Sequence, residues 1–506
     1  MDIWTSRIFH IFFQSRFAPV AILALTIATR WPALQHPRTI DDEATYSVVG
    51  NEIVDGGRLY IDAVERKPPL LFWVYAAVFK VAGKYNWKAL HLFALIWTLG
   101  TMAGLYVAGR NLFSRESGMI AAFLYAVFQP WAVFRNLAFN GEVVMNLPLV
   151  WAWALAFRQR PSRRRPELFA AGALLCAGFL LKQPAAIAAV PVGIYLLLPS
   201  YRRKGGLTFG QAVIQAGTLT AGFFGSLMIV AVVLWKQGIL GEAFYWTLTN
   251  HSIPHVYWET GPLVTLEFVA TCFPLVIAAV LASRYQSEIW LGKSPERIAL
   301  IGLVAVSAVG TGAGARFYPH YYIQLVPPLA LLAAPYLALL WSGKTQPRFW
   351  FLRPPVTYAW LAGTVLAFAM AHWSGLASVR APSKMGQYLF EHSAPDDRIF
   401  VWGQAPEIYL EAQRRPASRY VVTFPLTGYI FGGITGIDTR NRIVPGAWNN
   451  FEYDFREHPA VYIADVQVPA KNGQYPVKNF PVLAQLLSDR YSPVAQTAEG
   501  VIYRLR

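Results

Sequence analysis

Long apolar runs separated by short basic loops constrain this chain more than any other feature of its sequence. Runs long enough, or nearly long enough, to cross about 30 Å of hydrocarbon number about eleven. They cover residues 17–34, 89–109, 118–134, 142–158, 167–182, 184–199, 213–235, 262–282, 297–314, 320–341 and 356–376. The composition agrees, since 55% of the residues are hydrophobic and 14% are charged. The sequence therefore predicts a polytopic α-helical membrane protein.

The positions of Lys and Arg predict how these helices are oriented. The formal net charge is +16, but the basic residues gather in short loops between apolar runs, so we attribute the charge to membrane topology and not to nucleic-acid binding. Alternate loops are basic and are expected on the cytoplasmic side. The exoplasmic face then carries the polar loop at 35–88, the turns that contain Glu142, Lys182 and Arg316, and the carboxy-terminal tail.

The longest polar interval in the front half of the chain, residues 38–71, places charges beside apolar segments. Asp41, Asp42 and Glu43 follow the first apolar run, and residues 44–54 are predicted as a short helix whose positive dipole end suits these acids. Charges so close to a bilayer indicate chemistry. A helix amino-terminal cap with solvated charges explains the same spacing, so both interpretations stay open.

The second part of this interval brings a cation to the same surface. Residues 59–64 alternate like a short strand, and Lys67 precedes two prolines that fix an extended backbone. The apolar segment 70–81 is too short to cross the membrane and is predicted to lie in the interface. Lys67 is therefore expected near the carboxylates.

Two further charges are predicted at the exoplasmic ends of apolar runs. Glu142 begins one run, where a helix cap favoured by the dipole explains a carboxylate. Lys182 lies where one helix turns into the next before Pro184, and lysines at helix ends often extend to the membrane surface. The residues alone leave a structural and a functional role open for both.

A compact polar aromatic group precedes a late apolar run and contains Arg316, Tyr318, His320, Tyr321 and Tyr322. Tyrosines suit the membrane interface, but an interfacial role does not explain an arginine and a histidine on the outer side. A guanidinium fork matches phosphate oxygens, and a histidine donates a further hydrogen bond. The group is therefore a candidate phosphate-binding site.

The sequence gives little support for a metal site or for nucleotide binding. The loop at 236–261 contains His251 and His255, but Pro254 between them argues against a helical metal pair. The sequence has no HExxH, no CxxC, no Walker loop and no dinucleotide glycine motif after a strand. Nucleotide binding is therefore disfavoured.

Mixed polar sequence replaces the apolar runs after residue 377. Strands and helices are predicted to alternate, with strands at 398–402, 419–424 and 461–466 and helices at 407–413 and 482–490. We therefore predict a transmembrane domain at 1–376 and a small exoplasmic α/β domain at 377–506.

Several motifs resemble those of a known class of enzymes. DEATYSVVGNEI, GGRLYID and KPPLLFW occur in this order in the first long loop, HYYIQLVPP begins a late apolar run, and VWGQAPEIYLEAQRRPASRYVVTFPLTG lies in the tail. Together they resemble the GT-C class of membrane glycosyltransferases, in the bacterial branch related to protein O-mannosyltransferases and lipid A aminoarabinose transferases. The resemblance covers most of the chain and implies a GT-C fold in the bacterial inner membrane, with the active site and the tail on the periplasmic side.

This resemblance implies inverting transfer of a sugar from a polyprenyl-phosphate donor to a lipid, polysaccharide or protein acceptor. Asp42 is then the general base, and Glu43 orients the base or the acceptor. Lys67, Arg316 and His320 are expected to stabilise the donor phosphate. The resemblance makes Glu142 a second acid of the active site.

Weaker candidates are Asp41, Lys182 and Tyr321. Asp41 precedes the Asp-Glu pair and leaves a one-place ambiguity in the identity of the base, although alignment of DEATY favours Asp42. No cofactor is expected. A divalent ion bridging Asp42, Glu142 and the phosphate is one arrangement, but cationic side chains that replace such an ion are favoured.

Two other classes remain as alternatives. A transporter or flippase of lipid-linked sugars commonly has paired halves and helices broken at mid-membrane, whereas the polar residues here gather at one surface and no half-repeat is visible. A phosphoethanolamine-type transferase needs a nucleophile and usually a metal in a soluble domain, and the tail offers no clear cluster of ligands. Neither the sugar nor the acceptor has a recognisable signature.

Overall fold

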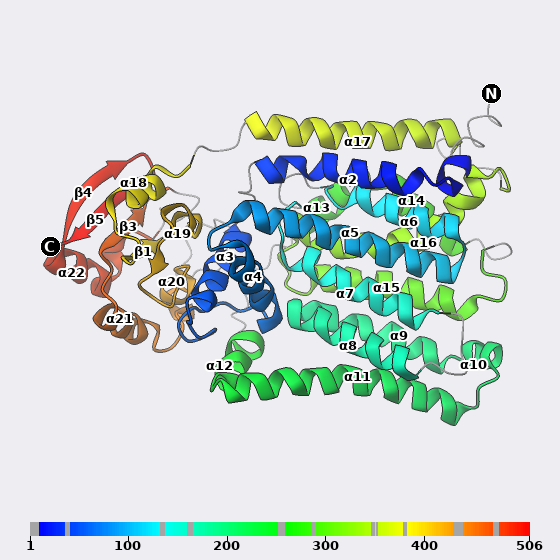
Figure 1. The fold of residues 1–506 in the computed structure, drawn as a ribbon, viewed down its shortest axis with the longest axis horizontal. Coiled ribbons are helices and arrows are strands. Elements are labelled where there is room, and N and C mark those ends of the chain that lie inside the picture. Colours follow the sequence, from blue (N-terminus) through cyan, green and yellow to red (C-terminus); the bar gives the residue numbers. More distant parts are fainter. Residues whose placement is uncertain are drawn as a thin grey trace. The chain divides into compact units, whose positions relative to one another are not determined.

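The computed structural model of the chain is shown in Figure 1. It describes residues 10–35, 41–131, 137–158, 165–250, 259–284, 289–345, 350, 353–377, 382–428, 439–468 and 475–506. The chain forms two compact units. The first contains residues 1–37, 91–232 and 256–378, and the second contains residues 38–90, 233–255 and 379–506. The first polar loop therefore belongs to the same unit as the tail.

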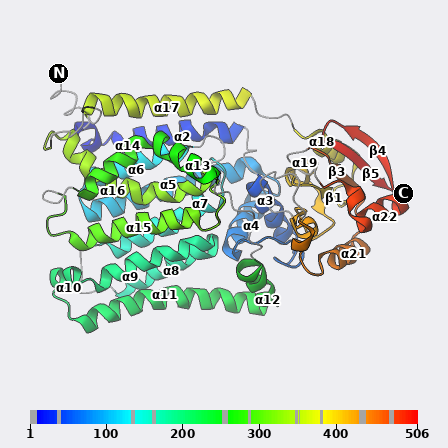
Figure 2. The ribbon, with the colours of Figure 1, turned by 180° about the vertical axis from the view of Figure 1, so that it is seen from behind.

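The first unit is a bundle of apolar helices that lie side by side with their axes roughly aligned (Figures 1 and 2). Its longer helices are α2 (Ala18–Gln35), α5 (Trp87–Leu112), α6 (Arg115–Phe128), α7 (Gly141–Ala156), α8 (Arg165–Leu181), α11 (Phe209–Lys236), α13 (Thr260–Thr271), α14 (Phe273–Arg284), α15 (Ser294–Gly312), α16 (Val326–Trp341) and α17 (Pro354–Ala377). Shorter segments are η2 (Gln183–Ala188), α9 (Ala189–Leu197), α10 (Pro199–Gly205) and η4 (Pro319–Leu325). Each predicted apolar run coincides with one or more of these helices.

Length and hydropathy distinguish the strongest membrane spans. Within the described residues, 4 helices are long and apolar enough to cross a membrane, or up to 6 if each of two bent pairs is one span. A multi-pass membrane protein is thus supported, whereas the predicted number of about eleven spans is not confirmed. The run at 262–282 is not straight, because α13 and α14 meet at 85°. Pro274 follows this bend, and a proline cannot supply the amide N–H that a continuous helix needs.

Capping fixes the helix ends on which two candidate residues lie. The Asn140 side chain accepts a hydrogen bond from the Val143 amide at 3.2 Å and so caps α7, while Glu142 lies in its first turn. After α8, Lys182 has an extended backbone and Pro184 lies in the first turn of the tight η2 helix, which begins at Gln183. Both charges therefore lie at helix ends, as predicted.

Glycines allow α8 and α11 to pack closely. A Cβ atom on Gly172 of α8 would meet the backbone carbonyl of Leu219, and one on Gly222 of α11 would meet the carbonyl of Phe169. Small residues at such contacts let two apolar helices approach without side chains between them. This contact explains why glycines occur inside two helices whose intrinsic stability they lower.

In the second unit, the first polar loop folds as two short helices, α3 (Asp41–Val54) and α4 (Pro69–Ala82). The ring of Tyr46 in α3 packs edge-to-face against Phe72 and Tyr75 in α4, with centroids 5.8 Å apart in both pairs. Gly50 permits this approach, because a Cβ atom there would lie 2.9 Å from the Tyr75 Cβ. The helices predicted at 44–54 and 70–81 are thus confirmed.

The strand predicted at 59–64 is wrong. Tyr60 adopts a left-handed conformation with φ of 67°, and its amide donates to the Ala63 carbonyl at 2.9 Å, which closes a turn. One isolated bridge joins Leu59 and Ala63. Leu59, Tyr60, Ala63 and Val64 are buried, and the Tyr60 ring packs edge-to-face on Phe72 of α4, so the apolar pattern reflects burial and not pairing in a sheet.

The loop at 236–261 begins with α12 (Leu240–Phe244) and the π-helical turn η3 (Tyr245–Thr249). Its two histidines, His251 and His255, lie outside the described residues. The interpretation of this loop therefore stays a prediction.

The tail folds around a five-stranded mixed sheet with the order β2-β1-β3-β5-β4. The strands are β1 (Arg398–Trp402), β2 (Arg415–Pro416), β3 (Tyr462–Val466), β4 (Tyr491–Thr497) and β5 (Gly500–Leu505), and the helices are α18 (Lys384–His392), α19 (Glu407–Ala412), α20 (Phe424–Thr427), α21 (Ala447–Glu457) and α22 (Pro481–Arg490). β1 pairs in parallel with β2 and β3, and β5 pairs antiparallel with β3 and β4. A small α/β fold is confirmed.

Most elements predicted in the tail are present, but the strand at 419–424 is wrong. There the carbonyl of Arg419 accepts a hydrogen bond from the Val64 amide of the first loop at 2.9 Å, and α20 begins at Phe424. The backbone polar groups of this apolar segment thus form hydrogen bonds with the first loop and within a helical turn, and not with a neighbouring strand. The strand that pairs with β1 on this side is β2, a few residues earlier in the chain.

Candidate active site

The predicted general base and its neighbour differ in exposure. Asp42 and Glu43 lie in the first turn of α3, and the Asp42 side chain is partly exposed whereas Glu43 is fully buried. Both charges act on Tyr75 of α4, since burial raises the pKa of its phenol and the charges of Glu43 and Asp42 raise it further. Tyr75 therefore stays protonated beside the two acids. Asp42 is the more exposed acid of this pair.

A tight turn holds Lys67. The buried Tyr60 hydroxyl donates to the Lys67 carbonyl at 2.8 Å, and the Lys67 amide donates to Glu65 Oε2 at 2.7 Å. Burial and the charge of Glu65 raise the pKa of Tyr60, so its hydroxyl keeps the proton that it donates. These two bonds fix the backbone of Lys67, while its side chain is partly exposed. The backbone position of Lys67 is therefore set by its own turn.

The first unit brings Glu142 and Lys182 together although they are far apart in the sequence. The Lys182 ammonium forms an ion pair with the Glu142 carboxylate, whose side chain is 1% exposed. The same ammonium lies 4.6 Å from the ring centroid of Tyr321. Gly141 leaves room for the lysine, because a Cβ atom there would lie 2.9 Å from Lys182 Cδ. One buried acid, one cation and one aromatic ring thus share a site.

His320 and Arg316 belong to the segment that ends in η4. The His320 ring is stacked on Tyr318 with centroids 5.7 Å apart and meets Tyr321 edge-on at 4.8 Å. Gln324 ties the segment to α15, since its amide donates to Thr311 Oγ1 at 3.1 Å and to the Tyr321 carbonyl at 2.9 Å. His320 is buried in this cluster.

The backbone around Arg316 is unusual. Ala315 and Phe317, on either side of it, have φ values of 48° and 49°, and such conformations of non-glycine residues cost about 1–3 kcal/mol each. The Phe317 ring occupies space left by Gly261 of α13, where a Cβ atom would lie 2.8 Å from the ring. Strain of this kind persists only where the surrounding structure over-determines the backbone, and Arg316 lies between the two strained residues.

The candidate residues therefore form two sets, each within one unit. Asp42, Glu43 and Lys67 belong to the second unit, and Glu142, Lys182, Arg316, His320 and Tyr321 belong to the first. The side chain of Asp41 lies outside the described residues. Among the residues that are described, no group of three His, Cys, Asp or Glu side chains is arranged to hold a metal ion.

Sequence reasoning did not identify Glu65 and Tyr75 as members of the site. Glu65 is buried and fixes the backbone of Lys67, and Tyr75 lies beside the two acids. The signal for Glu65 was an acid two residues before a predicted site lysine in an otherwise apolar turn. Tyr75 carried no signal, because one tyrosine in an apolar helix is equally expected in a membrane interface.

The chain is similar to known proteins both in sequence and in structure. The family model described as dolichyl-phosphate-mannose-protein mannosyltransferase matches residues 66–235. The structure is similar to that of ArnT from Cupriavidus metallidurans bound to undecaprenyl phosphate, with a TM-score of 0.63 and 14% sequence identity over 97% of this chain and 98% of that chain. It is also similar to the oligosaccharyltransferase of Archaeoglobus fulgidus in complex with zinc and sulfate, with a TM-score of 0.54 and 14% identity over 96% and 73% of the two chains. No curated protein matches the sequence.

Proposed function

Because the chain has the fold of the GT-C glycosyltransferases, we propose that it transfers a sugar from a polyprenyl-phosphate donor to a lipid, glycan or protein acceptor. The proposed place is the exoplasmic face of a bacterial inner membrane. The orientation is supported by the basic loops, which alternate with the loops that carry the candidate residues.

The observation that carries the proposal is the buried pair of Glu142 and Lys182 beside Tyr321 and His320 in a bundle with this fold. Charged side chains inside an apolar bundle are costly, and where they occur they mark paths of substrates or ions. A lysine and a histidine that converge on one aromatic ring also provide donors for phosphate oxygens. Binding of a lipid-linked phosphate accounts for all of these residues together.

In the proposed reaction Asp42 takes the proton of the acceptor hydroxyl as the hydroxyl oxygen attacks the anomeric carbon of the sugar. The bond between this carbon and the phosphate oxygen breaks, and the lipid phosphate leaves with the bonding electron pair. Attack opposite the leaving group inverts the anomeric centre. The partial exposure of Asp42 supports its role as the base, and the burial of Glu43 supports a role in orienting that base.

The leaving phosphate needs stabilisation as its negative charge grows. We assign this role to Lys67, Arg316 and His320, since preorganised donors at a developing charge lower the barrier. The hydrogen bonds of Tyr60 and Glu65 to the backbone of Lys67 support this assignment, because they fix the lysine before substrate binds. Lys67 and Arg316 can stabilise this charge as a divalent ion would, so we propose transfer without a metal.

The experiment that tests this function uses the full chain in lipid nanodiscs with radiolabelled sugars on short-chain polyprenyl phosphates. Donors with different hexoses and pentoses are incubated with envelope lipid, polysaccharide and protein fractions. We expect one donor to label one fraction, with inverted anomeric configuration in the product. In proteoliposomes, passage of a donor across the bilayer without label transfer to any acceptor would instead identify a flippase.

A further inference from the structure

A polar cavity of about 220 Å³ lies entirely within the second unit. It is formed where the turn after α3 meets the amino-terminal end of β1, the short strand β2 and the end of α21. Its wall contains Asp55, Gly56, Gly57, Asp62, Arg398, Arg415, Pro416, Ala417, Ser418, Arg419, Asp454 and His458. None of these residues has a role in the proposed transfer reaction.

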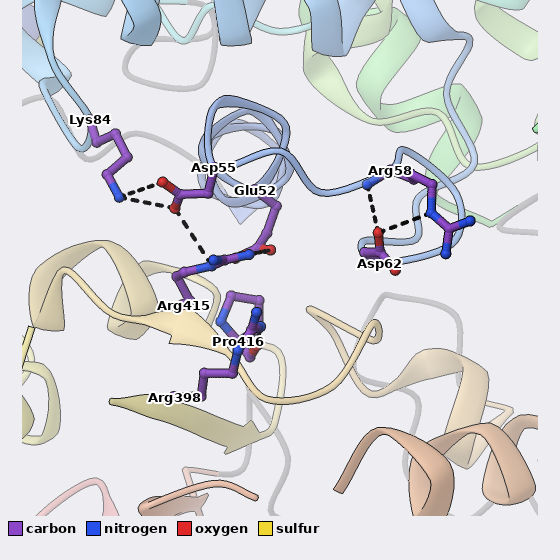
Figure 3. Close-up of polar contacts among 8 residues, drawn as sticks. All are labelled: Glu52, Asp55, Arg58, Asp62, Lys84, Arg398, Arg415 and Pro416. Carbon is purple, nitrogen blue, oxygen red and sulfur yellow. Dashed lines mark hydrogen bonds and ion pairs between the residues drawn. The ribbon is translucent and has the colours of Figure 1, made fainter. Parts of the chain in front are cut away.

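Two of the three arginines in this wall are held by carboxylates. Arg415 donates from Nε and Nη2 to the two carboxylate oxygens of Glu52, each at 2.8 Å (Figure 3). Arg419 forms a similar fork with Asp454, with its shortest bond, from Nη2 to Oδ1, at 2.7 Å. These two arginines are occupied by structural ion pairs.

The acids of the wall are also occupied. Both oxygens of Asp55 accept from the Lys84 ammonium, at 2.7 and 2.9 Å, and Asp62 accepts from the Arg58 amide at 2.7 Å (Figure 3). Each of these acids keeps lone pairs that can accept a further hydrogen bond. The wall is thus a set of fixed acceptors and fixed cations.

Arg398 is the exception among the cations. Its Nη1 donates to the Pro416 carbonyl at 2.7 Å, and within the part of the chain that the structure describes its guanidinium forms no ion pair. Figure 3 shows its side chain rising from β1 toward Pro416, beneath the Arg415 pairs. Burial is the main cause of the lowered pKa of Arg398, the charge of Glu52 acts in the opposite direction, and Arg415 lowers the pKa further. His458, an exposed residue, adds a further donor to the same wall.

We propose that this cavity binds an anionic sugar, with Arg398 on its carboxylate or phosphate group and with Asp55 and Asp62 on its hydroxyls. A guanidinium with unused donors matches the oxygens of such a group in charge and geometry. The hydroxyls of a sugar need acceptors, which the two acids supply. The volume of about 220 Å³ is enough for a single sugar residue. That an anionic sugar binds here is independent of the proposed function. That this sugar is part of the acceptor rests on the proposed function.

The test measures binding by ligand-detected NMR and calorimetry with the full chain in nanodiscs. The probes are glucuronate, which carries a carboxylate, and glucose 6-phosphate, with glucose and inorganic phosphate as neutral and sugar-free controls. We expect at least one acidic sugar to bind more tightly than both controls. Arg398→Gln should weaken this binding by about tenfold or more, the effect of one lost charged hydrogen-bonding group.

Arg504→Gln is the matched control, because Arg504 lies exposed on β5 of the same sheet and removing it changes the net charge equally. Equal binding by the two variants, or no saturable binding by the wild type, would overturn the proposal. Binding of phosphate as tight as that of glucose 6-phosphate would overturn the assignment to a sugar. If Arg398→Gln does not fold, His458→Ala, which changes an exposed side chain, should still weaken binding. The Asp42→Asn variant should bind normally without donor, so loss of transfer and loss of binding are measured separately.

Discussion

The ion pair of Glu52 and Arg415 joins the first loop to the tail within the second unit. Removing it tests how much this contact stabilises the second unit. Glu52 lies in α3 with a side chain that is 3% exposed, and Arg415 lies in β2 with a side chain that is 29% exposed. Two bonds of 2.8 Å connect them, and the Arg415 Nε is also 3.6 Å from Asp55. The hydrogen bond with Glu52 is the main cause of the raised pKa of Arg415.

Arg415→Met keeps the apolar stem of the arginine and leaves Glu52 buried without its partner. Breaking a fully buried pair costs about 3–5 kcal/mol, and because Arg415 is partly exposed we expect the lower end, about 3 kcal/mol. Hydrogen exchange of the α3 amides measures this locally and should become more than about a hundredfold faster.

The double variant Glu52→Gln/Arg415→Met is the matched control, since it removes the buried charge as well. It should recover much of the lost protection, because replacing both partners of a buried pair is often close to neutral. Unchanged exchange in Arg415→Met, or equal acceleration in the single and double variants, would refute the view that a buried uncompensated charge is responsible.

Three further predictions concern other parts of the chain. Gly172→Ala should destabilise the helix bundle by about 1–3 kcal/mol through overpacking against α11, whereas Gly217→Ala, which meets nothing within 4 Å, should not lower the melting temperature. Burial raises the pKa of Asp465, so its ionised form opposes folding at neutral pH; Asp465→Asn should raise the melting temperature at pH 7, and the gain should vanish as the pH falls toward the ordinary carboxyl pKa of 3.8. Lys182→Met should destabilise the protein more than Lys182→Met with Glu142→Gln, as measured by thermal unfolding in detergent.

The membrane helices and the first strand of the tail could be predicted because their signals are local. Apolar runs long enough to cross a bilayer need no tertiary information, and β1 has the continuous apolar sequence of a buried parallel strand. The failures at 59–64 and 419–424 have one cause. Both segments are apolar and buried, but which partner takes their backbone hydrogen bonds depends on tertiary contacts, here partly with each other.

β4 and β5 were not predicted, and their composition explains why. β4 contains Pro493 and a register shift beside it, and only its first residue is buried, so it lacks both the alternation and the apolar run of a strand. A proline is tolerated there because β4 lies at the edge of the sheet. The edge position of β4 is known only from the order of the strands in the folded sheet.

The candidate site was predictable to the extent that its residues are marked by sequence motifs. Asp42, Glu43 and Lys67 lie in motifs that resemble a known class, whereas the pairing of Glu142 with Lys182 depends on the packing of α7 against α8 and η2. No spacing rule connects two residues in different helices. Their roles in transfer stay predictions, for which the pairing gives only a physical rationale.

The most direct test of the central claim is the rate of sugar transfer by Asp42→Asn in a single turnover, so that product release does not limit the rate. The account predicts a loss of about a thousandfold relative to wild type, the upper part of the range for a general base, with donor binding retained. Asp489→Asn, an exposed acid at the end of α22, should transfer at the wild-type rate. Near-normal transfer by Asp42→Asn would contradict the account and make Asp41 or Glu142 the next acid to test.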